Sequence, residues 1–443
     1  MHRTLRCDRR MTTSPQYDRD LIWKELHARP YVRFAGPAHV FHFAFLTNDG
    51  PEISDHPGLN ALRQSIGLQP TYETDRHAIY TAQVPRLGRL VVAWERHTDF
   101  LACTLFLYDL EIPFVPFGVD CRSLLPDGFL ESFGTPPLVA TRFAIGSKDE
   151  MPDTLDGLSP LFEGHTVNGS QVMAGRAEVY SGYRVHDDSF GRIAIIVHQM
   201  SPQDLGRTVE RLLVIEDSYH LALLSLPLAR TLKSDLSQWE DHLVRQMEAL
   251  RRSDSMEQKR AVLDSLLELA AEVESLRAKV FSQFARSSAS VSLLQGRLRE
   301  LREGKIEHVL RLSRFLMRRL SPAAQTHHTV LQRLTHLSER IDRGADLLRT
   351  SIDLNVAEQN KRLLESVDRR ARLQLELQHA VEGLSVVILT YYTLGLIGHI
   401  LNGAHRLGLN LDPEIALAVA APILLLAFWG LIAVIRRRLR DHS

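Results

Sequence analysis

Two long apolar blocks near the C-terminal end constrain the architecture of this chain more than any other feature. Residues 384–401 and 415–435 contain no Asp, Glu, Lys or Arg. A helix needs about 20 apolar residues to cross the hydrocarbon core of a bilayer, so each block is long enough to span it. Pro422 is compatible with a transmembrane helix, because neighbouring groups satisfy the freed carbonyl. We therefore expect two transmembrane helices within residues 383–436; the alternative is a buried hairpin of core helices.

The basic residues that flank the two blocks predict their orientation. Residues 361–372 and 436–440 are rich in Lys and Arg, whereas the connecting residues 402–414 contain Arg406 as their one full cation. Because positively charged residues stay on the cytoplasmic side, both ends of the chain should be cytoplasmic, with a short outer loop between the helices. Residues 437–443 then form a basic cytoplasmic tail. Nothing at the N-terminus resembles a secretory signal peptide.

The residues before the first block, 205–382, predict a long helical stalk with a coiled-coil-like pattern. Leu, Ala, Arg, Glu and Gln dominate this region, and all are strong helix formers. Apolar residues recur at helical spacing at Val262, Leu266, Leu269, Val273, Leu276, Val280 and Phe284. We expect breaks near Pro227, Gly304 and Pro322, and a last helix that could continue into the first apolar block.

Residues 17–204 predict an α+β cytosolic domain, preceded by a disordered arm at residues 1–16. Runs rich in Val, Ile, Phe and Thr, bounded by Gly, Pro and Asp, predict strands at 38–47, 89–95, 101–107, 138–145, 174–183 and 192–198. Helical patterns occur at 21–27 and 58–67. Strands gathered with so few helices favour a sheet that is covered on one face.

The overall composition excludes several classes of protein. Lys and Arg total 53 and Asp and Glu total 53, so the chain lacks the basic excess of a general nucleic-acid binder. Cys7, Cys103 and Cys121 are its three cysteines, without the spacing of a disulfide framework or a cysteine-based zinc site. The sequence patterns of dinucleotide-binding proteins, P-loop proteins and zincin proteases are also absent.

Four polar clusters are the candidate functional segments. They mix acids, histidines or arginines with apolar neighbours and lie at residues 25–30, 95–100, 183–188 and 206–216. We favour buried ion-pair networks, because an unpaired buried charge is very costly. A second interpretation is a site for a divalent metal ion, since imidazole and carboxylate groups suit such ions. Its candidate ligands are His27, Glu95, His97, His186 and Asp187. A third interpretation is a binding groove.

The clusters also resemble segments of a bacterial family of membrane-anchored proteins of unknown function. The matching segments are ELHARP at 25–30, ERHTDF at 95–100, RVHDDSFGR at 184–192 and GRTVERLLVIEDSYHLALLSLP at 206–227. The two apolar blocks, with a Tyr-Tyr pair in the first, look like that family too. The resemblance covers nearly the whole chain from Tyr17 onward. It implies a cytosolic protein anchored in the bacterial inner membrane, and it supplies no reaction and no site residues.

A second resemblance concerns architecture alone. A cytosolic domain, a long stalk, two C-terminal spans and a basic tail are similar to the CorA-type magnesium and cobalt transporters, which are pentamers with the first span lining the pore. The chain departs from them in having Leu401, Asn402 and Gly403 where their Gly-Met-Asn signature is expected. If the first span lines a pore, the polar groups available to an ion are those of Thr390, Tyr391, Thr393, His399 and Asn402.

These observations lead to three functional hypotheses. The first is a membrane-anchored homo-oligomer whose cytosolic domain binds or senses a ligand or partner. The second is a CorA-like cation channel or transporter. The third is a membrane-tethered, metal-dependent enzyme. We assign no catalytic residue and favour a function other than catalysis, because no catalytic constellation accompanies the polar clusters.

Overall fold

The computed structural model describes residues 31–47, 53, 56–251, 255–406 and 413–440. The expected arm at 1–16, the helix at 21–27 and the end of the tail at 441–443 lie outside these residues. The chain divides into two compact units. The first, here called the sheet unit, combines Met1–Arg251 with Ser265–Asp342. The second, here called the helical unit, combines Arg252–Asp264 with Arg343–Ser443.

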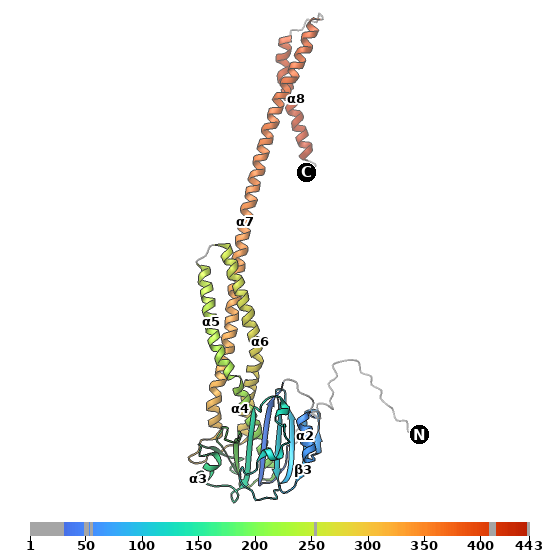
Figure 1. Ribbon diagram of the computed structural model, residues 1–443. Coiled ribbons are helices and arrows are strands. Elements are labelled where there is room, and N and C mark those ends of the chain that lie inside the picture. Colours follow the sequence, from blue (N-terminus) through green and yellow to red (C-terminus); the bar gives the residue numbers. More distant parts are fainter. Residues whose placement is uncertain (1–30, 48–52, 54–55, 252–254, 407–412, 441–443) are drawn as a thin grey trace, which may run out of the picture. The chain divides into compact units, whose positions relative to one another are not determined.

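The sheet unit is built around a nine-stranded mixed sheet with the order β2-β3-β4-β5-β1-β6-β9-β8-β7 (Figure 1). The strands are β1 (Ala38–Leu46), β2 (Gln69–Glu73), β3 (His77–Val84), β4 (Gly88–Arg96), β5 (Phe100–Tyr108), β6 (Val139–Ser147), β7 (Asn168–Val172), β8 (Ala177–Ser181) and β9 (Gly191–Val197). Strands β6 and β9 are parallel, and the other pairs are antiparallel.

The six expected strands are confirmed, whereas β2, β3 and β7 were not expected. Strands β2 and β7 lie at the two edges of the sheet. Edge strands tolerate residues that weaken a central strand, and these two contain Pro70 and Gly169 among polar neighbours. The apolar runs therefore indicate the six strands from β4 to β8 in the sheet order and miss both edges, together with β3, which lies next to an edge and mixes apolar and polar residues.

Both faces of the sheet are covered, which corrects the expectation of a single covered face. On one face β1, β5, β6 and β9 pack against helices α4 (Pro202–Leu224), α6 (Met256–Glu300) and α7 (Leu312–Arg406). On the other face Phe41, Phe43 and Trp94 pack against α2 (Pro57–Ile66) and the segment around Phe129. The short elements η2 (Cys121–Leu124), η3 (Glu131–Phe133), α3 (Leu155–Leu158) and η4 (Ser159–Phe162) lie in the connections. As a result, β1 and β5 are buried along nearly their whole length.

The breaks between the long helices follow two of the three expected positions. Helix α4 ends at Leu224 and α5 (Leu226–Arg251) begins at once, with Pro227 in its first turn, where proline is tolerated. Gly304 lies in the connection between α6 and α7. The third expectation was wrong, because Pro322 lies inside α7.

The start of α7 explains the position of Pro322. The amide of Leu312 donates to Ser170 Oγ at 3.1 Å, and the amide of Ser313 donates to the Glu303 carboxylate at 3.1 Å. These acceptors satisfy amides that have no partner within the helix, so α7 begins ahead of its proline. Both acceptors lie outside the helix, one of them in β7, and no local pattern in the sequence indicates them.

Within the sheet unit, α5, α6 and the first part of α7 lie side by side (Figure 1). Their apolar seams are buried, including Leu266, Val273 and Leu334. A buried polar contact also links this region: the His327 ring of α7 lies 3.1 Å from the hydroxyls of both Ser225, which directly precedes α5, and Ser287 of α6. Burial lowers the pKa of His327, so a neutral ring links the helices.

The helical unit contains the two apolar blocks. Helix α7 is continuous from Leu312 to Arg406 and includes the first block, as expected, and α8 (Pro413–Arg440) contains the second. The two helices approach closely at Gly398, where an added Cβ would lie 3.3 Å from Cδ1 of Leu417. A glycine therefore permits the contact between α7 and α8.

Replacing Gly206 by alanine tests the packing of α4 against the preceding chain. A Cβ at Gly206 would collide with the carbonyl oxygen of Val32. We expect Gly206→Ala to lower the free energy of unfolding of the full chain by roughly 1–3 kcal/mol, since backbone must move to relieve the clash. Urea unfolding followed by the fluorescence of the buried Trp94 measures this change.

The matched control is Gly296→Ala in α6, where no atom lies within 4 Å of the added Cβ. This variant should gain roughly 0.5–1 kcal/mol, because alanine is the better helix former. Equal effects of the two substitutions would contradict the close approach of α4 and Val32.

Candidate functional site

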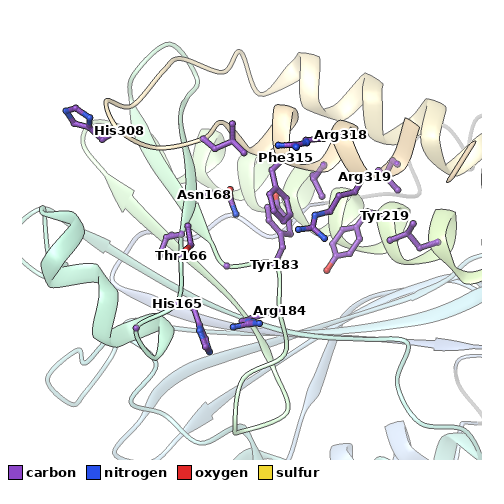
Figure 2. Close-up of a pocket in the computed structure, with 17 residues that line it drawn as sticks. His165, Thr166, Asn168, Tyr183, Arg184, Tyr219, His308, Phe315, Arg318 and Arg319 are labelled. Atoms are coloured by element: carbon purple, nitrogen blue, oxygen red, sulfur yellow. The ribbon is translucent and has the colours of Figure 1, made fainter. Parts of the chain in front are cut away.

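A cleft of about 1090 Å³ opens on the sheet unit (Figure 2). It lies between four segments that are distant in sequence. They are residues 164–168, which lead into β7, residues 182–184 after β8, Tyr219 and Leu223 of α4, and residues between His308 and Leu320, which lead into α7 and form its first turns. Because the sheet and the N-terminal cap of α7 fix these segments, the cleft belongs to the folded core of the unit.

The cleft gathers basic side chains without acidic ones. Arg184, Arg318, Arg319, His165 and His308 line it and are exposed, and none of the described lining residues is Asp or Glu. In the part of the chain that the structure describes, the three arginines form no ion pair with an acidic side chain. Their guanidinium groups are therefore available to an anion.

Aromatic rings form the wall behind these cations. The rings of Tyr183 and Phe315 are stacked, with centroids 5.0 Å apart and planes at 11°. The guanidinium carbon of Arg319 lies 4.7 Å from the centroid of Phe315, a cation–π contact. Tyr219 meets Tyr183 edge to face at 5.7 Å. The column of rings holds Arg319 in place at the cleft (Figure 2).

Two lining residues have an uncommon backbone conformation. Tyr183 has φ 46° and His308 has φ 60°, both in the left-handed region. This region costs energy for a residue with a bulky side chain, and such residues cluster at functional sites. The amide of Tyr183 donates to Ser181 Oγ at 3.1 Å, which helps to fix the turn that directs its ring toward Phe315.

A buried polar network connects α4, the helix that contains Tyr219, to the sheet. The ring of His42 in β1 contacts Asp217 Oδ1 at 2.9 Å through Nε2 and Thr104 Oγ1 at 2.8 Å through Nδ1. The hydroxyl of Thr141 donates to Glu216 Oε2 at 2.9 Å. Helix α4 is thereby tied to three central strands of the sheet, β1, β5 and β6.

Burial governs the protonation of this network. Burial raises the pKa of Glu216 to about 7, against its contacts with Thr141 and His42. Burial lowers the pKa of His42, but the charge and hydrogen bond of Asp217 outweigh it and the net pKa is raised. Burial and the nearby Glu216 carboxylate also raise the pKa of both Tyr183 and Tyr219, so these hydroxyls stay protonated in the cleft.

The cluster at residues 183–188 forms the ion-pair network that its composition suggests. Arg192 Nη2 lies 3.0 Å from both Glu163 Oε1 and Asp188 Oδ2, and Arg142 pairs with the same Asp188. His186 Nδ1 lies 3.0 Å from Glu163 Oε2. Burial lowers the pKa of His186, and the charge of Arg192 acts in the same direction. Asp187 is exposed.

The cluster at residues 95–100 forms a turn. Strand β4 ends at Arg96 and β5 begins at Phe100, so His97 and Asp99 lie in the connection between the two strands. Glu95 Oε2 lies 3.4 Å from His97 Nε2, whose ring stacks on Phe100. Asp99 instead pairs with Arg286 at 2.7 Å.

The metal hypothesis receives no support from these contacts. Across the described residues, no group of three or more His, Cys, Asp or Glu side chains could hold a metal ion. His27 lies outside those residues, so the set of His27, Glu95, His97, His186 and Asp187 stays a prediction.

The candidate pore residues are placed on α7. The hydroxyls of Thr390 and Thr393 donate to the carbonyls of Val386 and Leu389, each at 2.7 Å. Tyr391, His399 and Asn402 have exposed side chains. None of these contacts tests ion transport, which stays a prediction.

A family model matches residues 14–439, nearly the whole chain. The chain belongs to the family described as Protein of unknown function (DUF3422). No curated protein matches it. Membership in DUF3422 agrees with the resemblance to a family of unknown function, and it assigns neither a reaction nor a site.

Several residues of the cleft are absent from the candidates chosen by sequence. Tyr183 and Arg184 lie in the polar cluster at 183–188, and Tyr219 lies in the segment 206–227 that carries the family resemblance, whereas His165, His308, Arg318 and Arg319 lie in neither. The pair of adjacent arginines at 318–319 resembles many exposed pairs on charged helices, so no local signal distinguishes it.

Replacing Glu216 by glutamine tests the buried network. The pKa of Glu216 rises from 4.5 to about 7 on folding, so its contribution to stability is fully present below pH 4.5 and is lost as the pH rises through 7. Glutamine removes this loss and can still accept the Thr141 hydrogen bond. We expect Glu216→Gln to be more stable than the parent chain by roughly 3 kcal/mol at pH 8 and nearly equal at pH 4.

Urea unfolding of the full chain at pH 4, 6 and 8 measures the difference. The control is Glu268→Gln at an exposed position of α6, which should leave the pH dependence unchanged. A Glu216→Gln variant with the pH dependence of the parent chain would refute the assignment.

Proposed function

We propose that this chain is a membrane-anchored protein in which α7 and α8 cross a bilayer as a helical hairpin and the sheet unit binds a ligand in the cytosol. The observation that carries the proposal is the exposure of the apolar segments. Three helical stretches among the described residues are long and apolar enough to cross a membrane. The apolar window in α7 is 17% buried and that in α8 is 0% buried, against 44% for the stretch that begins with α4.

The cost of leaving these segments in water supports a lipid environment. In α8, Leu426 is 64% exposed and Trp429 is 67% exposed. Keeping one such side chain in water forgoes roughly 1.5–3 kcal/mol of burial free energy, and the two segments contain many of them. By contrast, Val209 and Leu212 of α4 are buried against the sheet. The third stretch therefore belongs to the core of the sheet unit.

The charges on either side of the spans support the orientation. Exposed Arg369, Arg370 and Arg372 precede the first span, and a run of arginines follows the second. Under the positive-inside rule both flanks lie in the cytosol, in a bacterial inner membrane. The contact between Gly398 and Leu417 fits two helices that pack within the bilayer.

The exposed part of α7 ahead of the first span supports a homo-oligomer. Residues 358–381 are exposed throughout. A stripe on one face of this helix contains Val356, Leu363, Val367, Leu377 and Val381. An apolar stripe on a helix outside the membrane needs a partner, and a second copy of the same helix offers the matching stripe.

Vesicle labelling tests the anchor and its orientation. In a Cys7→Ser background, in which Cys103 and Cys121 remain buried, a cysteine is introduced by Ser443→Cys or by Asn410→Cys. We expect an impermeant thiol reagent to label Ser443→Cys in inverted vesicles only and Asn410→Cys in right-side-out vesicles only. Extraction by alkaline carbonate, or labelling of both positions from one side, would contradict the anchor.

Disulfide cross-linking tests the homo-oligomer. The substitution Leu363→Cys places a thiol on the apolar stripe, and Glu365→Cys places one on the opposite face of the helix. Oxidation of the membrane-embedded chain should yield a covalent dimer for Leu363→Cys, several-fold more than for the control. Equal yields, together with a monomer mass by light scattering in detergent, would refute the proposed interface.

A further inference from the structure

We infer that the cleft of the sheet unit binds a small organic molecule that carries two or more phosphate groups. The inference rests on the proposed function, since it names the class of ligand that the anchored sheet unit would bind. The contacts at the cleft, its volume and its charge support it, and none of them depends on the membrane.

The charge of the cleft selects an anion. Arg184, Arg318 and Arg319 lack carboxylate partners in the described chain, whereas Arg142 and Arg192 of the same unit have them. Basic groups that share a cleft repel one another, and a bound anion relieves this repulsion. The planar guanidinium fork matches the oxygens of a phosphate group, so arginine is the residue most suited to phosphate recognition.

The positions of the basic groups indicate more than one anionic group. Figure 2 shows Arg184 and His165 on one side of the cleft and Arg318 and Arg319 on the other, where α7 begins. A single phosphate group can accept from several guanidinium groups on one wall, but it is compact, whereas linked phosphate groups extend from one wall toward the other. Two or more linked phosphate groups supply enough charge and enough acceptors for both walls.

The selectivity for phosphate resides in side chains. The amides of Leu312 and Ser313 at the start of α7 already donate to Ser170 and Glu303, so these two amides are not available to an anion. The Phe315 ring, stacked on Tyr183, orients the Arg319 guanidinium at 4.7 Å. This arrangement limits the conformational freedom that Arg319 would lose on binding an anion.

The remaining lining indicates an organic body on the ligand. The cleft, at about 1090 Å³, is as large as the sites that hold whole small molecules and far larger than inorganic phosphate requires. Leu223, Leu316 and Leu320 add apolar surface, and Tyr219 presents a protonated hydroxyl. A nucleoside diphosphate combines an apolar or aromatic body with linked phosphates and is the appropriate probe of this class.

Calorimetric titration of the purified full chain in detergent tests the inference, with ADP as the probe. We expect saturable binding that weakens as salt is added, since ion pairs with phosphate contribute to it. Arg319→Gln and Arg184→Gln should each weaken ADP binding by about tenfold or more, because each removes a charge-assisted contact. The matched control is Arg314→Gln, at an exposed arginine of the same helix that does not line the cleft, and it should bind as the parent chain does.

Further titrations separate the parts of the inference. Pyrophosphate should bind more weakly than ADP, since it lacks the organic body, and citrate should bind more weakly than pyrophosphate. Absence of binding by both ADP and pyrophosphate, or an equal loss in Arg314→Gln and Arg319→Gln, would overturn the site. Equal affinities for citrate and pyrophosphate would overturn the assignment to phosphate. Vesicle labelling reports the anchor independently, so either proposal can fail alone.

Discussion

The burial of β1 on both faces is the constraint on which the sheet unit depends. A polar side chain on such a strand must find its partners within the core, because water cannot reach it. His42 lies opposite Thr104 of β5 and Thr141 of β6, and α4 supplies the adjacent acids Glu216 and Asp217. These contacts fix the rotation and height of α4 on the sheet. They also place Tyr219, two residues beyond Asp217 on α4, at the cleft.

A second tertiary contact positions the opposite wall. Ser170 in β7 and Glu303 after α6 accept the first amides of α7, so that helix begins at Leu312. Phe315, Arg318 and Arg319 follow within the next two turns and reach the cleft. Pro322 comes after them and offers no amide to the carbonyl of Arg318, which is the usual cost of a proline inside a helix. The cap that begins α7 and the proline inside it therefore lie on either side of the residues that α7 contributes to the cleft.

The parts of the structure that sequence predicts are those with a local physical cause. Apolar runs indicate most of the central strands, and proline and glycine indicate the helix breaks at Pro227 and Gly304. The charge-free blocks indicate the last part of α7 and most of α8. The edge strands β2 and β7 escape prediction because their five residues are mostly polar and include Pro70 or Gly169, so neither contains an apolar run. The cleft escapes it for a different reason. Arg184 and Arg319 are brought to one cleft by the sheet and by a cap that is remote in sequence.

The arginines of the sheet unit differ in whether they have acidic partners, and the overall charge balance of the chain makes this difference informative. A chain with a large basic excess would leave arginines without acidic partners by number alone. Here Lys and Arg equal Asp and Glu at 53 each, so acids are available. Arg142 and Arg192 have a shared carboxylate at Asp188, whereas Arg318 and Arg319 face a cleft whose described lining contains no acid. The absence of acids from that lining is therefore a local property of the cleft, as a site for an anionic ligand requires.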